Sequence, residues 1–76
     1  MRWLFDRNVL ENESRSVIFR YIKENPETDA QKIIQETNLS RGTVLYHLDI
    51  LVYAGMVTSL KDNRFKKYRT AMKVIV

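Results

Sequence analysis

The sequence predicts a small α+β domain, mostly α, in which three helices are followed by a two-stranded β-hairpin. Through most of residues 12–54, apolar residues recur every three or four positions, which is helical periodicity. After Gly55 the pattern changes to the alternation of side chains that is typical of strands. The chain has 76 residues, which is enough for one domain with one core.

Composition excludes several classes of protein. There is no cysteine, so disulfides and thiolate metal sites are excluded, and a single histidine cannot hold zinc without several carboxylates. No apolar run approaches the roughly 18 residues of a membrane span, and the N-terminal region lacks the long apolar stretch of a signal peptide. We therefore expect a cytoplasmic protein with no metal, no cofactor and no membrane attachment.

The positive charge is concentrated in the last quarter of the sequence. Residues 1–56 hold seven Lys/Arg and eight Asp/Glu, whereas residues 57–76 hold six Lys/Arg and one acidic residue. This asymmetry is typical of a surface that binds a polyanion. A basic hairpin that is merely solvated is the alternative interpretation.

An apolar segment and a helix are expected first along the chain. Residues 1–11 include Trp3-Leu4-Phe5, and we expect them to form a short helix that covers the core or packs against a second subunit. Residues 12–25 are expected to form a helix with Asn12 as its cap and Asn25-Pro26 as its stop. Its inward stripe comprises Leu10, Ser14, Val17, Ile18, Tyr21 and Ile22. Phe19 lies off this stripe, where it would meet the N-terminal aromatic residues.

Residues 28–54 are expected to form two helices joined by a tight turn. Thr28 and Gln31 fit a capping box, which would start the first helix at Asp29. Asn38 suits a left-handed turn, and Ser40 is a good N-cap for the second helix. Gly55 suits the position just after that helix, where the chain takes a positive φ. A short helix, a tight turn and a longer helix make up the helix-turn-helix plan.

Helical periodicity divides the second of these helices into two faces. The inward arc comprises Thr43, Val44, His47, Leu48, Ile50, Leu51 and Ala54, and the outward arc comprises Arg41, Gly42, Leu45, Tyr46, Asp49, Val52 and Tyr53. His47 is therefore expected to be a hydrogen-bonded core residue. Since the sequence offers it no cysteine, no second histidine and no nucleophile paired with a base, we expect no enzyme.

Residues 56–71 are expected to form the hairpin. The strands are predicted over residues 57–61 and 65–70, and Asp62-Asn63-Arg64 supplies the turn. Alternation places Phe65, Lys67 and Arg69 on one face and Lys66, Tyr68 and Thr70 on the other, so we expect an aromatic residue to pack on each face. The apolar tail, residues 72–76, is expected to pair at the hairpin edge or across a dimer.

The string LSRGTVLYHLDILVYAGMV, followed by the basic stretch SLKDNRFKKYR, resembles winged helix-turn-helix transcriptional regulators of the ArsR/MarR type, most closely those common in archaea. The resemblance covers most of the chain. It rests on the Leu-Ser opening, the Thr-Val pair, the Tyr-His-Leu run, the Ala-Gly stop and the aromatic-basic strand. It implies double-stranded DNA as the ligand, with the second helix of the motif in the major groove and the hairpin, or wing, along the adjacent backbone or minor groove.

The resemblance also implies which residues contact DNA. On the recognition helix these are Arg41, Gly42, Thr43, Leu45 and Tyr46, and on the wing they are Lys61, Asn63, Arg64, Lys66, Lys67 and Arg69. The sequence departs from the family where Leu45, Asp49, Val52 and Tyr53 replace the usual polar or basic residues. An exposed strip of Leu45, Val52 and Tyr53 would alternatively suit a protein partner. We expect a homodimer, because so small a domain cannot cover its apolar ends alone.

Overall fold

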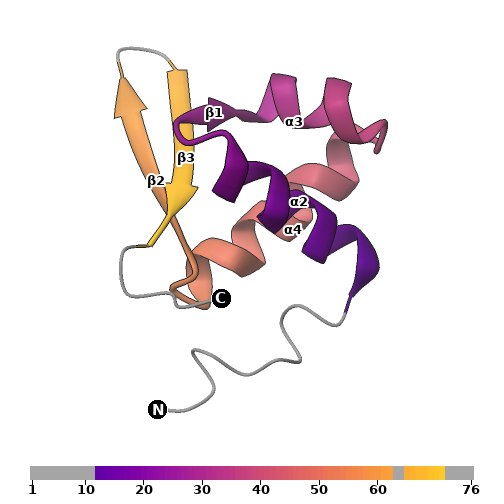
Figure 1. The fold of residues 1–76 in the computed structure, drawn as a ribbon, viewed down its shortest axis with the longest axis horizontal. Helices are drawn as coiled ribbons and strands as arrows, with labels where there is room; N and C mark the ends of the chain where they lie inside the picture. Colours follow the sequence, from indigo (N-terminus) through magenta and orange to yellow (C-terminus); the bar gives the residue numbers. More distant parts are fainter. Residues whose placement is uncertain (1–11, 63–64, 72–76) are drawn as a thin grey trace.

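The computed structural model describes residues 12–62 and 65–71. In chain order the elements are α2 (Glu13–Glu24), β1 (Thr28–Asp29), α3 (Ala30–Thr37), α4 (Arg41–Tyr53), β2 (Val57–Asp62) and β3 (Phe65–Thr70). The three helices pack together beside a small antiparallel sheet (Figure 1). The predicted α+β class is confirmed. The apolar segment 1–11, the tail 72–76 and the wing residues Asn63 and Arg64 lie outside the described residues.

Helix α2 begins and ends where the sequence predicts. The Asn12 side chain caps it by accepting a hydrogen bond from the Arg15 backbone N–H at 3.0 Å. Such a cap stabilises a helix by about 1 kcal/mol. At the other end, the backbone N–H of Asn25 donates to the carbonyl oxygens of Tyr21 and Ile22. Among the described residues, no helix is long and apolar enough to cross a membrane.

The inward face of α2 is broader than its predicted stripe. Phe19 is only 4% exposed and belongs to the core, whereas Val17 is 40% exposed. The expected place of Val17 on the inward stripe is therefore wrong. Phe19 is buried although it lies off that stripe, and its expected contact with residues 1–11 falls outside the described residues. Both α4 and the sheet pack against α2, so its buried surface is turned toward Phe19 and away from Val17.

The start of α3 differs from the prediction. Asp29 is the N-cap, and its carboxylate accepts a hydrogen bond from the Lys32 backbone N–H at 2.8 Å, so α3 begins at Ala30. The predicted capping box of Thr28 and Gln31 is wrong. Thr28 lies instead in β1, a strand that was not predicted. Its backbone is held extended by pairing with Tyr68 of β3.

The turn into α4 and the end of α4 follow the local sequence signals. Asn38 has a left-handed conformation with φ 62°, and Ser40 Oγ accepts a hydrogen bond from the Thr43 backbone N–H at 3.2 Å. The last helical residue is Tyr53, one residue earlier than expected, because Ala54 is the C-cap. Gly55 follows with φ 80°, a conformation that glycine adopts without strain.

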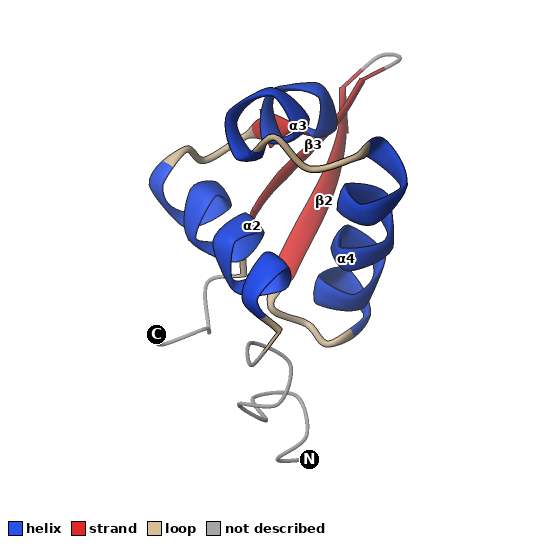
Figure 2. Cartoon of the chain, turned by 90° about the vertical axis from the view of Figure 1, so that its right-hand side faces the viewer, coloured by secondary structure: helices blue, strands red, loops and turns tan. Residues whose placement is uncertain are grey.

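The sheet has the strand order β1-β3-β2, and both pairings are antiparallel. β2 and β3 form the predicted wing, which projects beyond the helices in Figure 2. Tyr68 packs into the core and is 7% exposed, but Phe65, three residues nearer the tip, is 63% exposed. The expectation that an aromatic residue packs on each face of the wing is therefore wrong for Phe65.

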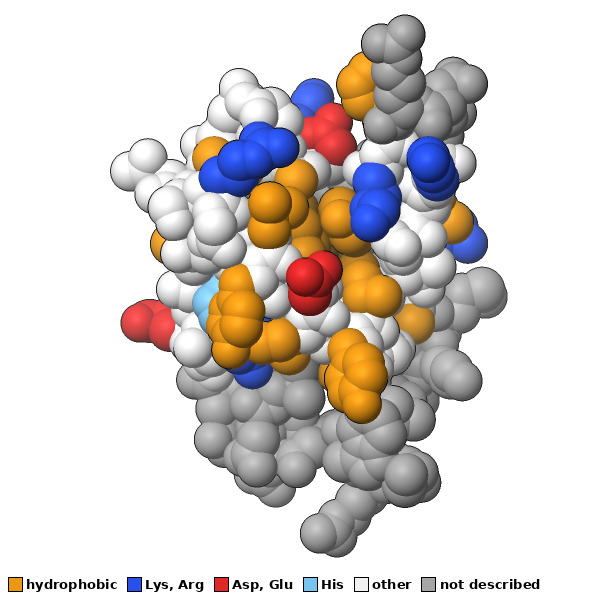
Figure 3. All heavy atoms as spheres, turned by 180° about the vertical axis from the view of Figure 1, so that it is seen from behind, with side chains coloured by type: hydrophobic (Ala, Val, Ile, Leu, Met, Phe, Trp, Pro, Cys, Tyr) orange, Lys and Arg blue, Asp and Glu red, His pale blue; other side chains and the backbone are white. Residues whose placement is uncertain are grey.

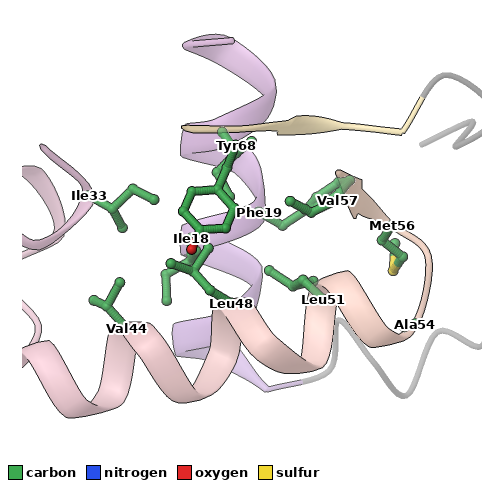
Figure 4. Packing of buried hydrophobic residues seen from close by; sticks show 11 residues of the cluster. Ile18, Phe19, Ile33, Val44, Leu48, Leu51, Ala54, Met56, Val57 and Tyr68 are labelled. Atoms are coloured by element: carbon green, nitrogen blue, oxygen red, sulfur yellow. The ribbon is translucent and has the colours of Figure 1, made fainter. Parts of the chain in front are cut away.

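The core lies between the three helices and the sheet. Its members are Ile18, Phe19, Ile22, Ile33, Val44, Leu48, Leu51, Ala54, Met56, Val57 and Tyr68. Figure 4 shows these side chains converging from α2, α3, α4 and the strands. Since α4 contributes Val44, Leu48 and Leu51, all at most 1% exposed, the core fixes how α4 is rotated and which side chains it presents to solvent.

Candidate nucleic-acid interface

The outward face of α4 is exposed as the periodicity predicts. Its seven members, Arg41, Gly42, Leu45, Tyr46, Asp49, Val52 and Tyr53, are all exposed. Among its large hydrophobic members, Tyr46 and Tyr53 are the most exposed, with exposed fractions of 61% and 81%. Figure 3 shows this side of the molecule, where hydrophobic side chains occupy the centre and Lys/Arg side chains lie on both sides.

Thr43 has a different environment from the other predicted recognition-helix residues. It is half-buried, and its backbone N–H donates to Ser40 Oγ. Its side-chain hydroxyl lies 2.8 Å from the same Ser40 oxygen in a second hydrogen bond. Thr43 therefore stabilises the start of α4, and Arg41, Gly42, Leu45 and Tyr46 remain as the exposed set.

A groove separates α4 from the wing. It is lined by Asp29, Ala30, Gln31, Arg41, Leu45, Phe65, Lys66 and Tyr68. The structure thus brings together Arg41 and Leu45 of α4 with Lys66 of the wing, all predicted to contact DNA. Phe65 and Gln31 also line this groove, although neither is among the residues predicted to contact DNA. Only the packing of α3 and β3 beside α4 places them there.

The wing cations divide between the two faces of the hairpin. Lys61 and Lys66 are directly opposite each other in the register of β2 and β3, so their side chains share one face. That face includes the groove with Arg41. Lys67 and Arg69 alternate with Lys66 and therefore point to the other face. Lys67 is half-buried there and lines a separate hollow with Tyr21, Glu24, Asn25, Pro26, Glu27, Thr28, Asp29 and Lys32.

Two like charges placed directly opposite in a sheet repel each other. Lys61 and Lys66 are in this arrangement and both are exposed. An anion bound between them would remove the repulsion. This arrangement points to a polyanion more specifically than the net charge does.

Asp49 is the single acidic residue on the outward face of α4. Burial raises the pKa of the Tyr68 hydroxyl, and the negative charge of Asp49 raises it further. Asp49 therefore lies close enough to act on a side chain of β3.

His47 is a hydrogen-bonded core residue, as predicted. It is 5% exposed, and Arg15 Nε donates a hydrogen bond to its Nδ1 at 3.2 Å. Because Nδ1 accepts this bond, the ring is neutral and carries its proton on Nε2. Burial lowers the pKa of His47, and the positive charge of Arg15 lowers it further. Among residues 12–62 and 65–71, no three His, Asp or Glu side chains are grouped so as to hold a metal ion.

The fold and the site together define a winged helix-turn-helix domain, in which α3 and α4 form the helix-turn-helix and β2 and β3 form the wing. Residues 12–59 match the family described as bacterial regulatory protein, arsR family. The match covers more than half of the chain, so the chain belongs to this family of transcriptional regulators, which are not enzymes. The predicted resemblance to ArsR-type regulators is confirmed.

Solved structures share this fold. An ArsR-like transcriptional regulator from Rhodococcus sp. RHA1 is 27% identical with a TM-score of 0.76, over 83% of this chain and 58% of that protein. A predicted DNA-binding transcriptional regulator from E. coli is 21% identical with a TM-score of 0.82, over 88% of this chain and 70% of that protein. A homodimeric winged helix-turn-helix DNA-binding domain from Mycobacterium bovis is 23% identical with a TM-score of 0.76, over 84% of this chain and 58% of that protein.

The chain is shorter than these relatives. It spans 58% of the length of the Rhodococcus and Mycobacterium proteins, less than two thirds. No protein with a curated description matches the sequence significantly. The family and the fold therefore rest on the family match and on the solved structures.

Proposed function

We propose that the chain is a transcriptional regulator that binds double-stranded DNA, with α4 in the major groove and the wing against the adjacent backbone. The observation that supports this most strongly is that Arg41, Leu45 and Lys66 line one groove, although they come from two separate elements. A recognition helix contacts base edges mainly through its N-terminal residues, and Arg41 and Leu45 lie in the first turns of α4. The wing then lies beside the same duplex.

The wing supplies the attraction to phosphate in this proposal. Lys61 and Lys66 project from one face of the hairpin, next to the groove. Each phosphate that a cation neutralises releases condensed counterions, so affinity falls with salt at a slope of about 0.9 per contact. Arg64 and Asn63, which the family resemblance also assigns to the wing contact, belong to the same proposal.

A protein partner on α4 is the competing function. Leu45, Val52 and Tyr53 are exposed on the outward face, as this alternative requires. Membership in a family of transcriptional regulators favours DNA instead. In addition, the groove next to Leu45 carries the cations Arg41 and Lys66, which an apolar protein surface would leave unpaired.

A fluorescence anisotropy titration tests the proposal. The 76-residue protein is titrated onto a labelled random-sequence duplex at about 50 mM and about 200 mM salt. We expect saturable binding at low salt that weakens steeply at the higher concentration. Asp49→Lys, which replaces a repelled carboxylate by a cation, is expected to bind the same duplex more tightly. Absence of binding by both proteins at low salt would exclude the DNA function and favour the protein partner.

We also propose that the protein acts as a homodimer. Support comes from the apolar composition of residues 1–11 and 72–76 and from the homodimeric domain of Mycobacterium bovis with the same fold. Sedimentation over micromolar concentrations is expected to show a dimer that Trp3→Ala weakens. A monomer throughout, unchanged by this substitution, would contradict the proposal. A cytoplasmic location and a closer likeness to archaeal regulators stay predictions from the sequence.

A further inference from the structure

Three exposed side chains form one ridge along α4. Arg41, Leu45 and Asp49 follow each other at intervals of four residues, and each interval advances about 6 Å along the helix and turns about 40°. From Arg41 to Asp49 the ridge is therefore about 12 Å long and turns about 80° around the helix axis. Within the described part of the chain, neither Arg41 nor Asp49 makes a side-chain hydrogen bond or ion pair. Both charged groups are available to a ligand.

The ridge carries no net charge. Arg41 and Asp49 cancel, and no lysine is present on the outward face of α4. Attraction to phosphate, which supplies most sequence-independent binding, therefore gains little from this helix. Asp49 is exposed, so the packing of the core does not require an acidic residue at this position. What the ridge offers is three different chemistries in a fixed order: a guanidinium, an apolar side chain and a carboxylate.

We infer that this ridge selects DNA sites in which a guanine, a thymine and a cytosine fall within about four base pairs, read in the major groove by Arg41, Leu45 and Asp49. The inference rests on the proposed DNA binding. A guanidinium donates to O6 and N7 of guanine, an apolar side chain contacts the C5 methyl group of thymine, and a carboxylate accepts from the N4 amino group of cytosine. At about 3.4 Å per base pair, a ridge of about 12 Å spans three to four pairs.

Asp49 gives the pattern its selectivity. A carboxylate in the groove is repelled by phosphates at every sequence, and a hydrogen bond from a base amino group offsets that repulsion only at some of them. In the major groove, adenine also presents an amino group, but its N7 beside it is an acceptor that faces the carboxylate unfavourably. Asp49 therefore weakens binding to random DNA and favours cytosine over the other bases.

The thymine contact is tested by removing a single methyl group. Duplexes bound by the 76-residue protein are selected from a random library, and each thymine of the preferred duplex is replaced in turn by deoxyuridine, which lacks only the C5 methyl group. We expect one replacement to weaken binding about fourfold, as for one buried methyl-sized group. Leu45→Ala should abolish the sensitivity to that replacement. Val52→Ala, a matched apolar truncation on the same face, should keep it.

The carboxylate contact is tested on the same duplex. Asp49→Asn should lose the preference for one C·G pair and bind random duplexes more tightly than the native protein does. Thermal unfolding verifies that each variant is folded, which the exposure of Leu45 and Asp49 favours. Selection without any sequence preference, or a deoxyuridine effect that persists in Leu45→Ala, would overturn the inference and leave the DNA function standing. Failure to bind any duplex would instead remove the proposed function itself.

Discussion

The outward face of α4 and the wing lie on the same side of the molecule but carry different chemistry. α4 presents one arginine, one aspartate and a run of apolar and aromatic side chains, whereas residues 57–71 hold five Lys/Arg and one Asp. Figure 3 shows the result, a hydrophobic centre with cations beside it. In the proposed complex the wing supplies attraction to any duplex and α4 supplies the choice among duplexes. The predictions below separate the two contributions.

The largest effect is expected on the face of the wing that turns toward α4. Replacing Lys61 and Lys66 with Ala should lower the magnitude of the slope of log K against log salt by roughly 1.8 and weaken binding on the order of fiftyfold at 0.1 M salt. Specific and random duplexes should be affected equally, because phosphates carry no sequence. Anisotropy titrations at several salt concentrations measure both quantities.

A matched control removes two charges from the other face of the wing. The double substitution Lys67→Ala and Arg69→Ala lowers the net charge by the same amount but leaves the groove cations in place. We expect a clearly smaller change in the salt slope. Equal slopes for the two double variants would show that net charge alone matters and that the face of the wing does not.

Substitutions of Arg41 test the contribution of α4 to the choice among duplexes. If Arg41 contacts a guanine, Arg41→Ala should weaken binding to the preferred duplex by about 1 to 3 kcal/mol and binding to random DNA by less. Arg41→Lys keeps the charge but cannot donate two parallel hydrogen bonds to one guanine. Compared with Arg41→Ala, it should therefore regain affinity for random DNA more fully than preference for the selected duplex. Titration of both variants on both duplexes decides this. An equal loss of affinity on the preferred and the random duplex would show that Arg41 contacts a phosphate and not a base.

Gly42 should give opposite results for stability and binding. A Cβ added at Gly42 meets no atom within 4 Å, so the fold itself does not require a glycine at this helical position. Gly42→Ala should therefore raise the free energy of unfolding by about 0.5 to 1 kcal/mol. It should also weaken DNA binding, because a methyl group is added where α4 approaches the duplex. Higher stability with unchanged affinity would show that DNA does not approach this turn closely.

His47 links acid sensitivity to the inner face of α4. Its pKa is lowered in the folded protein from an ordinary value of 6.5, so below about that pH the unfolded chain takes up a proton that the folded protein resists. The stability that the neutral His47 ring contributes should therefore be fully present above pH 6.5 and should be lost as the pH drops below that value. His47→Gln keeps an acceptor for Arg15 but does not titrate. Denaturant unfolding at about pH 7.5 and pH 5.5 should show a larger loss in the native protein than in this variant.

Local signals in the sequence were sufficient for the helix-turn-helix itself. Asn38, Ser40 and Gly55 each act within a few residues of their own position, through a left-handed turn, a cap and a helix stop. The inward and outward faces of α4 also follow from its own periodicity. These features could be predicted because their causes lie within one stretch of the chain.

The errors have their causes elsewhere in the chain. Thr28 was expected to cap α3, but pairing with Tyr68, forty residues later, holds it in a strand. Val17 is exposed because α4 and the sheet pack against the other side of α2, where Phe19 is buried. Phe65 is exposed because the hairpin extends past the helices. The groove beside Leu45 likewise depends on contacts between distant parts of the chain. Residues from four elements, β1, α3, α4 and β3, line it, and a single sequence does not reveal which elements become neighbours.

The strand β1 is two residues long, yet it decides which part of the wing is held firmly. β3 pairs with β1 at Tyr68 and Lys67, whereas Lys66 and Phe65 have only β2 beside them. β3 is thus paired on both of its edges at Lys67 and Tyr68, but on one edge at Lys66 and Phe65. Asp29 of β1 also caps α3, so this short strand links β3 directly to the start of that helix. We expect Phe65 and Lys66, paired on one side only, to adjust to a bound duplex more readily than Lys67 and Tyr68, which are paired on both sides.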